Sequence, residues 1–111
     1  MAQNFQRTLN RNITLLASPQ ELRAATTTND AIIGVRCTNT SGVSVDITVY
    51  IKNTSTNYYI IKDAPIPTGG SLELIDGGSK VVLQTGDSVE AYASAATSVD
   101  IILSVVDSIS T

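Results

Sequence analysis

The sequence contains no histidine and no tryptophan, and Cys37 is its only cysteine. Ser-His-Asp and Cys-His catalytic arrangements therefore cannot form, and the common zinc and redox-metal sites lack their ligands. A single cysteine also excludes an internal disulfide, and we expect Cys37 to be a buried thiol on an apolar strand. The acids stand singly in predicted turns, as at Asp63, Asp76 and Asp87. We therefore expect no catalytic residue, no metal and no cofactor, and predict that the chain is not an enzyme.

Charge is scarce and uneven. Only 15% of the 111 residues are charged, with a net charge of -3, and no stretch combines basic clusters with aromatics. The sequence thus predicts no nucleic-acid partner. No apolar run suffices for a signal peptide or membrane span, so we expect no membrane partner and a product made in the cytoplasm. Residues 1–36 carry four arginines against two acids, which favours docking on an acidic neighbour, including a second copy.

β-Branched residues are abundant and recur with period two, which is typical of half-buried strands. In residues 45–52 the odd positions are apolar, so we expect the even positions, including Thr48 and Tyr50, to face water. In residues 31–38 we expect Ile33 inward and Ile32 outward. Shorter strands are predicted at residues 5–9, 22–25, 58–62, 72–75, 80–83 and 89–93, and a long one at 99–106.

Turn-forming segments separate these strands about every ten residues, which favours one all-β domain built as an antiparallel β-sandwich, jelly-roll-like, with eight or nine strands. Residues 1–12 are expected to be an extended N-terminal arm or a first edge strand, and residues 13–111 the sandwich. Gly77 and Gly78 predict a tight hairpin over residues 72–83. Pro65 and Pro67 indicate a sheet crossing or an edge. A short helix over residues 19–25 is the alternative to a strand there.

Four short segments follow one another along the sequence in an order that resembles a known group of proteins. They are Ile-Ile-Gly-Val-Arg-Cys-Thr-Asn at residues 32–39, Tyr-Tyr-Ile-Ile-Lys-Asp-Ala-Pro-Ile-Pro at 58–67, Gly-Gly-Ser-Leu-Glu-Leu at 69–74 and Lys-Val-Val-Leu-Gln at 80–84. With the Met-Ala-Gln-Asn-Phe opening and the Gly-Asp pair at 86–87, the chain resembles small virion structural proteins of tailed bacteriophages, notably phages of cyanobacteria. The resemblance spans nearly the whole chain.

The resemblance implies a virion protein without saying where in the virion it lies. The first hypothesis is a capsid decoration or cement protein, a homo-oligomer whose main partner is the major capsid protein. The alternative is a neck, tail or fibre component, and a third possibility is a host-surface glycan-binding module that uses tyrosines. Each would place the protein in an assembled virion.

The candidate contact residues follow from the same patterns. Ile102 and Val106 form a second apolar row on the nominally exposed side of residues 99–106, which needs a cover. The aromatic pair at 58–59 lies on a strand with two apolar faces, and the N-terminal segment carries an aromatic and two arginines. The predicted contact residues are Phe5, Arg7, Arg11, Ile32, Tyr58, Tyr59, Ile102 and Val106.

Overall fold

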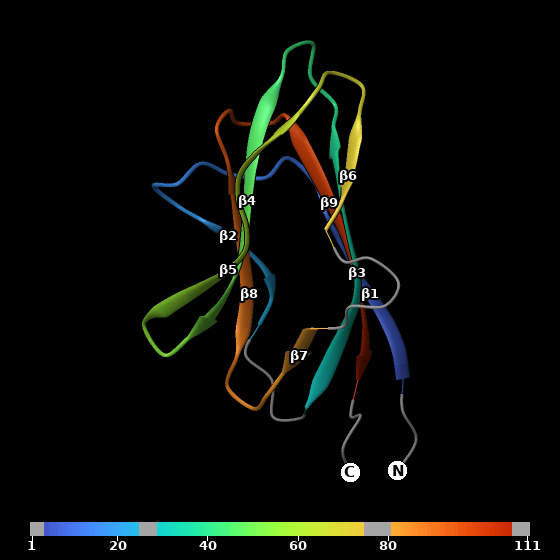
Figure 1. The fold of residues 1–111 in the computed structure, drawn as a ribbon, viewed down its shortest axis with the longest axis vertical. Helices are drawn as coiled ribbons and strands as arrows, with labels where there is room; N and C mark the ends of the chain where they lie inside the picture. The colour runs from blue at the N-terminus through green and yellow to red at the C-terminus, as the bar shows by residue number, and fades with distance from the viewer. Residues whose placement is uncertain (1–3, 25–28, 75–80, 108–111) are drawn as a thin grey trace.

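The computed structural model describes residues 4–24, 29–74 and 81–107, which form two antiparallel sheets packed face to face (Figure 1). Sheet A contains β1 (Asn4–Asn10), β3 (Asp30–Asn39), β6 (Ser71–Glu73), β7 (Val81–Leu83) and β9 (Val99–Asp107). Sheet B contains β2 (Gln20–Arg23), β4 (Val45–Asn53), β5 (Thr56–Ile66) and β8 (Ser88–Ala93). The predicted all-β sandwich is therefore confirmed. Residues 20–23 form a strand, so the alternative of a helix there is wrong.

The strand order is that of a jelly roll. Sheet A runs β1-β9-β3-β6 and sheet B runs β2-β8-β4-β5. β6 and β7 share one position, because β6 pairs with β3 at Arg36–Thr38 and β7 pairs with the same strand at Asp30–Ile32. Each sheet thus has four strand positions, as in a double Greek key.

This shared position corrects the predicted hairpin over residues 72–83. Both short strands run antiparallel to β3, which is long enough to take them end to end along one edge. They therefore run in the same direction instead of pairing with each other. The two glycines that suggested the turn lie outside the described residues.

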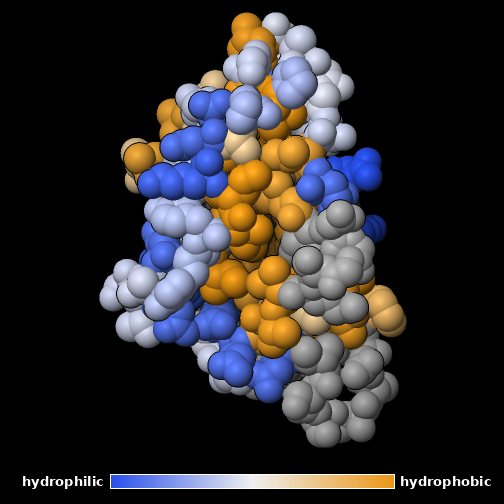
Figure 2. Space-filling view, viewed as in Figure 1, coloured by the Kyte–Doolittle hydropathy of each residue, from blue (hydrophilic) through white to orange (hydrophobic). Residues whose placement is uncertain are grey.

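The core lies between the two inner faces. Odd positions of β9 and β4 point inward, as predicted, and Val49, Ile101 and Leu103 are fully buried. Cys37 is also fully buried, and loss of hydration, with a smaller effect of Glu73, raises the pKa of its thiol to about 12. Figure 2 shows an apolar band along the edge of the sandwich between the layers. Partly buried Ile60, Ile61 and Leu72 pack against the core.

One bulge reverses a prediction on β3. The pairing of β3 with β9 shifts register between Ile32 and Gly34, so a residue is inserted on β3 at this point. Ile32 consequently points inward and is completely buried, whereas Ile33 is only partly buried and lines the outer side. The expected outward direction of Ile32 was wrong for this reason, because a strict two-residue period assumes an unbroken ladder.

The outer face of sheet B is also less exposed to solvent than the alternating sequence pattern predicts. Thr48 and Tyr50 are buried, Thr48 within hydrogen-bonding distance of the Asp63 backbone N–H and Tyr50 between the rings of Tyr59 and Tyr92. The Tyr50 hydroxyl donates to Glu90 over 2.7 Å. Desolvation and this hydrogen bond raise the pKa of Tyr50. These local contacts, which the alternating pattern does not encode, cover the middle of the face.

Two sets of polar contacts join segments that are distant in the sequence. The amide nitrogen of Asn39 donates to the carbonyls of Val43 and Ile66 over 2.7 and 2.9 Å, while its oxygen accepts from Ser41. Arg23 of sheet B donates to fully buried Asp30 of sheet A through both Nε and Nη2. The crossing at Pro65 and Pro67 lies as predicted, where edge strand β5 leaves sheet B for β6.

Candidate protein-contact surface

β1 is amphipathic, but its apolar side chains do not point toward the core as those of an edge strand usually do. β1 pairs with β9 so that Phe5 lies opposite Val106, Arg7 opposite Ser104 and Leu9 opposite Ile102. These pairs point away from the core, while polar Gln6, Thr8 and Asn10 lie on the core side. Phe5 and Leu9 are 78% and 62% exposed. The apolar side of β1 therefore faces outward.

Neighbouring strands continue this apolar surface across sheet A. The register places Arg36 of β3 opposite Ile102 of β9 on one side and Glu73 of β6 on the other. Ile102 is 42% exposed. We name the set the sheet A outer surface; it comprises Phe5, Arg7, Leu9, Ile33, Arg36, Glu73, Ile102 and Ser104.

The sheet A outer surface is hollowed. One hollow of about 370 Å³ lies between Ile33, Arg36, Glu73 and Ile102, and others adjoin Leu9 and Phe5. Its floor is Gly34, where a β-carbon would come within 3.5 Å of a Glu73 oxygen. A glycine at the bulge thus keeps the centre of the surface low. Apolar rims around shallow hollows suit the insertion of side chains from another polypeptide.

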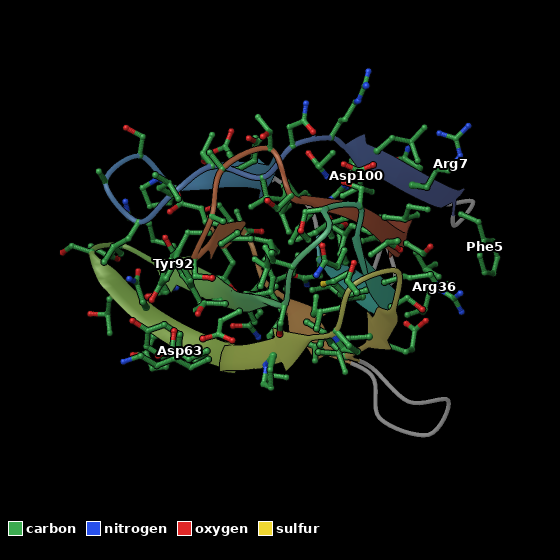
Figure 3. All side chains as sticks on the ribbon, turned by 90° about the horizontal axis from the view of Figure 1, so that it is seen from above. Phe5, Arg7, Arg36, Asp63, Tyr92 and Asp100 are labelled. Atoms are coloured by element: carbon green, nitrogen blue, oxygen red, sulfur yellow. The ribbon has the colours of Figure 1, made fainter. Side chains whose placement is uncertain are left out.

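The charges on this surface are mainly arginine. Arg36 Nε lies 3.4 Å from Glu73 Oε1, and Glu73 also accepts from the Val35 backbone N–H over 3.2 Å. No described residue forms an ion pair with Arg7. Figure 3 shows Phe5, Arg7 and Arg36 projecting from the same side of the sandwich, and Tyr92 and Asp63 from the other. Arginine beside exposed aromatic and aliphatic side chains is a composition enriched at protein interfaces.

The structure brings together part of the predicted contact set. Phe5, Arg7 and Ile102 share the sheet A outer surface, and Arg11 lines the hollow beside Leu9. Val106 lies on the same side but is only 9% exposed, so this member of the predicted apolar row is already covered within the chain. Val106 therefore offers little area to a partner.

The other predicted residues lie elsewhere. Ile32 is in the core, as described above. Tyr58 and Tyr59 lie on β5 of sheet B; both are about half exposed, and Lys62 lies 5.0 Å from the centre of the Tyr59 ring. The contact set predicted from the sequence is therefore split between the two sides of the sandwich.

Sequence reasoning missed Leu9, Ile33, Arg36 and Glu73. Leu9 had a usable signal, because residues 5, 7 and 9 alternate with polar residues 6, 8 and 10. The position of Ile33 depends on the bulge, and the meeting of Arg36 with Glu73 depends on pairing between segments 37 residues apart. Neither has a local signature.

The described residues contain no group of three or more histidine, cysteine, aspartate or glutamate side chains placed to hold a metal ion. Within the same ranges, no helix is long and apolar enough to cross a membrane. The sheet A outer surface has hollows, exposed apolar side chains and arginines that can donate hydrogen bonds. These are the means of protein recognition.

The sequence matches no protein-family profile and no curated protein. The fold, in contrast, matches solved structures. A chain of the acid-stable capsid of Helicobacter pylori bacteriophage KHP30 superposes with a TM-score of 0.59 at 7% identity, over 96% of this chain and 88% of that one. A chain of the Bacillus endospore appendages, a family of disulfide-linked pili, has a TM-score of 0.54 at 14% identity, over 98% and 88%.

A chain of infectious bursal disease virus, Gx strain, is similar with a TM-score of 0.54 at 12% identity. That match covers all of this chain but 34% of the viral one, so this domain spans about a third of its length. At these identities the likeness concerns the fold alone. The described residues form a nine-stranded jelly-roll-like β-sandwich, a fold shared with viral capsid proteins and pilus subunits.

Proposed function

We propose that this chain is a structural subunit of a bacteriophage virion, acting as a capsid decoration or cement protein, with no enzymatic activity. It bridges neighbouring shell subunits, chiefly the major capsid protein, through the sheet A outer surface, and works in many copies. The observation that carries the proposal is the exposure of Phe5, Leu9 and Ile102 side by side on one regular sheet.

The fold supports this function as a rigid scaffold. Both sheets pack on one core, so the contact surface is preformed and loses little conformational freedom on binding. A protein that binds only the assembled shell stabilises that state by mass action, and repeated copies multiply the effect. The phage-virion resemblance of the sequence and the capsid likeness of the fold support the same role.

The test is the variant Ile102→Asp in the phage that carries this gene. A carboxylate at a covered apolar contact would be buried without a partner, so we expect the variant to fold but to be depleted from particles at least tenfold. Val43→Asp is the matched control, because Val43 is 62% exposed in a turn outside this surface. Equal incorporation of both variants would contradict the proposal.

The likeness to a pilus subunit favours a second candidate, a neck, tail or fibre component. Such a component would use the same surface in a smaller assembly. Counting the copies in purified particles by quantitative mass spectrometry separates the candidates. Hundreds of copies support decoration, whereas a few to a dozen, with loss of tails on deletion, support the alternative.

A glycan-binding role has less support. Stacking of sugars needs an aromatic platform, and Tyr50 is enclosed between its neighbours, which leaves Tyr58 and Tyr59 as the more exposed rings. Binding of the protein to a glycan array, and loss of that binding in Tyr58→Ala, would support the glycan-binding role.

A further inference from the structure

Within the described residues, the outer edge of β1 differs from the other sheet edges in its length and regularity. β2 has four residues and a register shift between Glu21 and Arg23. β6 and β7 have three residues each. β5 carries Pro65, two register shifts and a positive φ at Asp63. Short length, bulges and proline are the means by which proteins prevent unwanted strand pairing.

β1 has none of these features. Its seven residues pair with β9 in seven consecutive steps without a shift, and it contains no proline. The residues that alternate with Phe5, Arg7 and Leu9 carry no charge; they are Gln6, Thr8 and Asn10. Within the described residues β1 pairs with β9 alone, so every second residue presents its N–H and C=O at the open edge.

We propose that β1 is a docking edge that accepts an extended strand of another polypeptide, one with alternating apolar and acidic side chains. An added strand would continue sheet A, and its outward side chains would lie beside Phe5, Arg7 and Leu9. Main-chain hydrogen bonds would supply affinity and these side chains specificity. This proposal rests on the proposed function, because it names the partner chemistry of the same surface.

The charges specify an acidic partner strand. Arg7 lies between the two exposed apolar residues of β1, and no described residue pairs with it in an ion pair. Directly opposite charges on adjacent strands stabilise pairing, whereas like charges oppose it. A carboxylate flanked by apolar residues therefore matches the sequence of outward side chains on β1.

A second copy of β1 does not fit this edge. Antiparallel self-pairing that places Phe5 opposite Leu9 sets Arg7 opposite Arg7 of the other copy, and in-register parallel pairing does the same. Antiparallel registers centred on Phe5 or on Leu9 bring only one apolar pair together, and the register centred on Leu9 sets Arg7 opposite Arg11. The occupant we infer is therefore a strand of different sequence.

The test uses the purified full chain and two capped peptides, Thr-Val-Thr-Glu-Thr-Val-Thr and the same peptide with lysine at the centre. Amide hydrogen exchange by NMR is followed at peptide concentrations up to about the millimolar range. We expect the glutamate peptide to slow exchange at alternate β1 amides that point away from β9. The lysine peptide should bind roughly 3- to 10-fold more weakly.

Arg7→Glu should reverse this preference, and Lys62→Glu, on β5 of the other sheet, should leave it unchanged. The proposal is overturned by absence of protection on β1, by protection of β5 or β2 instead, or by equal response to both peptides. Self-association that protects β1 without peptide would also overturn it. These results concern the free chain, so they are separate from the incorporation of Ile102→Asp into particles, which tests the proposed function.

Discussion

The alternation of β9 gives a quantitative prediction for the isolated chain. Leu103 points into the core and is fully buried, while its neighbour Ile102 is 42% exposed on the sheet A outer surface. Leu103→Ala removes three buried carbons, worth about 2.4 kcal/mol of transfer free energy at ~0.8 kcal/mol per group. The cavity left behind raises the expected loss of unfolding free energy to about 3–4 kcal/mol.

Ile102→Ala should cost much less in the free protein. About half of its side chain already contacts water, and the remaining burial and lost β-propensity amount to about 1 kcal/mol. Urea unfolding followed by circular dichroism measures both variants. For a domain of this size, the difference of about 2–3 kcal/mol corresponds to roughly 8–13 °C in Tm. Equal losses for Ile102→Ala and Leu103→Ala would refute the assigned faces of β9.

Three further predictions concern the core and its polar contacts. Arg23→Met should destabilise the fold by about 3–5 kcal/mol, because it removes the guanidinium that compensates fully buried Asp30, and combining it with Asp30→Leu should restore part of the loss in denaturant unfolding. Asn39→Ala should cost about 1–3 kcal/mol, since the carbonyls of Val43 and Ile66 lose the amide donor that joins them and each keeps only a serine hydroxyl, and a midpoint unchanged in urea would contradict this contact. The folded pKa of Cys37 is raised from 9.0 to about 12, so its contribution to stability is fully present below pH 9 and declines as pH rises towards 12; native protein should react with a thiol reagent at pH 8 far more slowly than urea-unfolded protein.

The sequence predicted most of the fold because burial of one strand face leaves a local signature. Eight or nine strands were expected and the described residues form nine, and the alternation at Ile47, Val49, Ile101 and Leu103 identified the inner face correctly. Two of the wrong predictions show why the rest could not be read from local patterns. A bulge at Ile32–Gly34 breaks the period of two, and the paired glycines at 77–78 suggested a hairpin although both flanking strands pair with β3.

The candidate surface was predictable only in part. Ile102 was predicted as a contact because its apolar row needs a cover, and Phe5 and Arg7 because they lie on the N-terminal segment; the three do lie together. Arg36 and Glu73 join them through cross-strand register, which long-range pairing decides. Tyr58 and Tyr59 lie on β5, which belongs to sheet B, whereas β1 belongs to sheet A. Local sequence patterns do not reveal which sheet a strand joins.

The most direct test of the account is a reconstruction, by electron cryomicroscopy, of the particle that contains this chain. We expect density of a neighbouring polypeptide in contact with Phe5, Leu9 and Ile102, with an extended segment running beside β1. A sheet A outer surface that faces only solvent in every copy would contradict the claim that this surface is the contact.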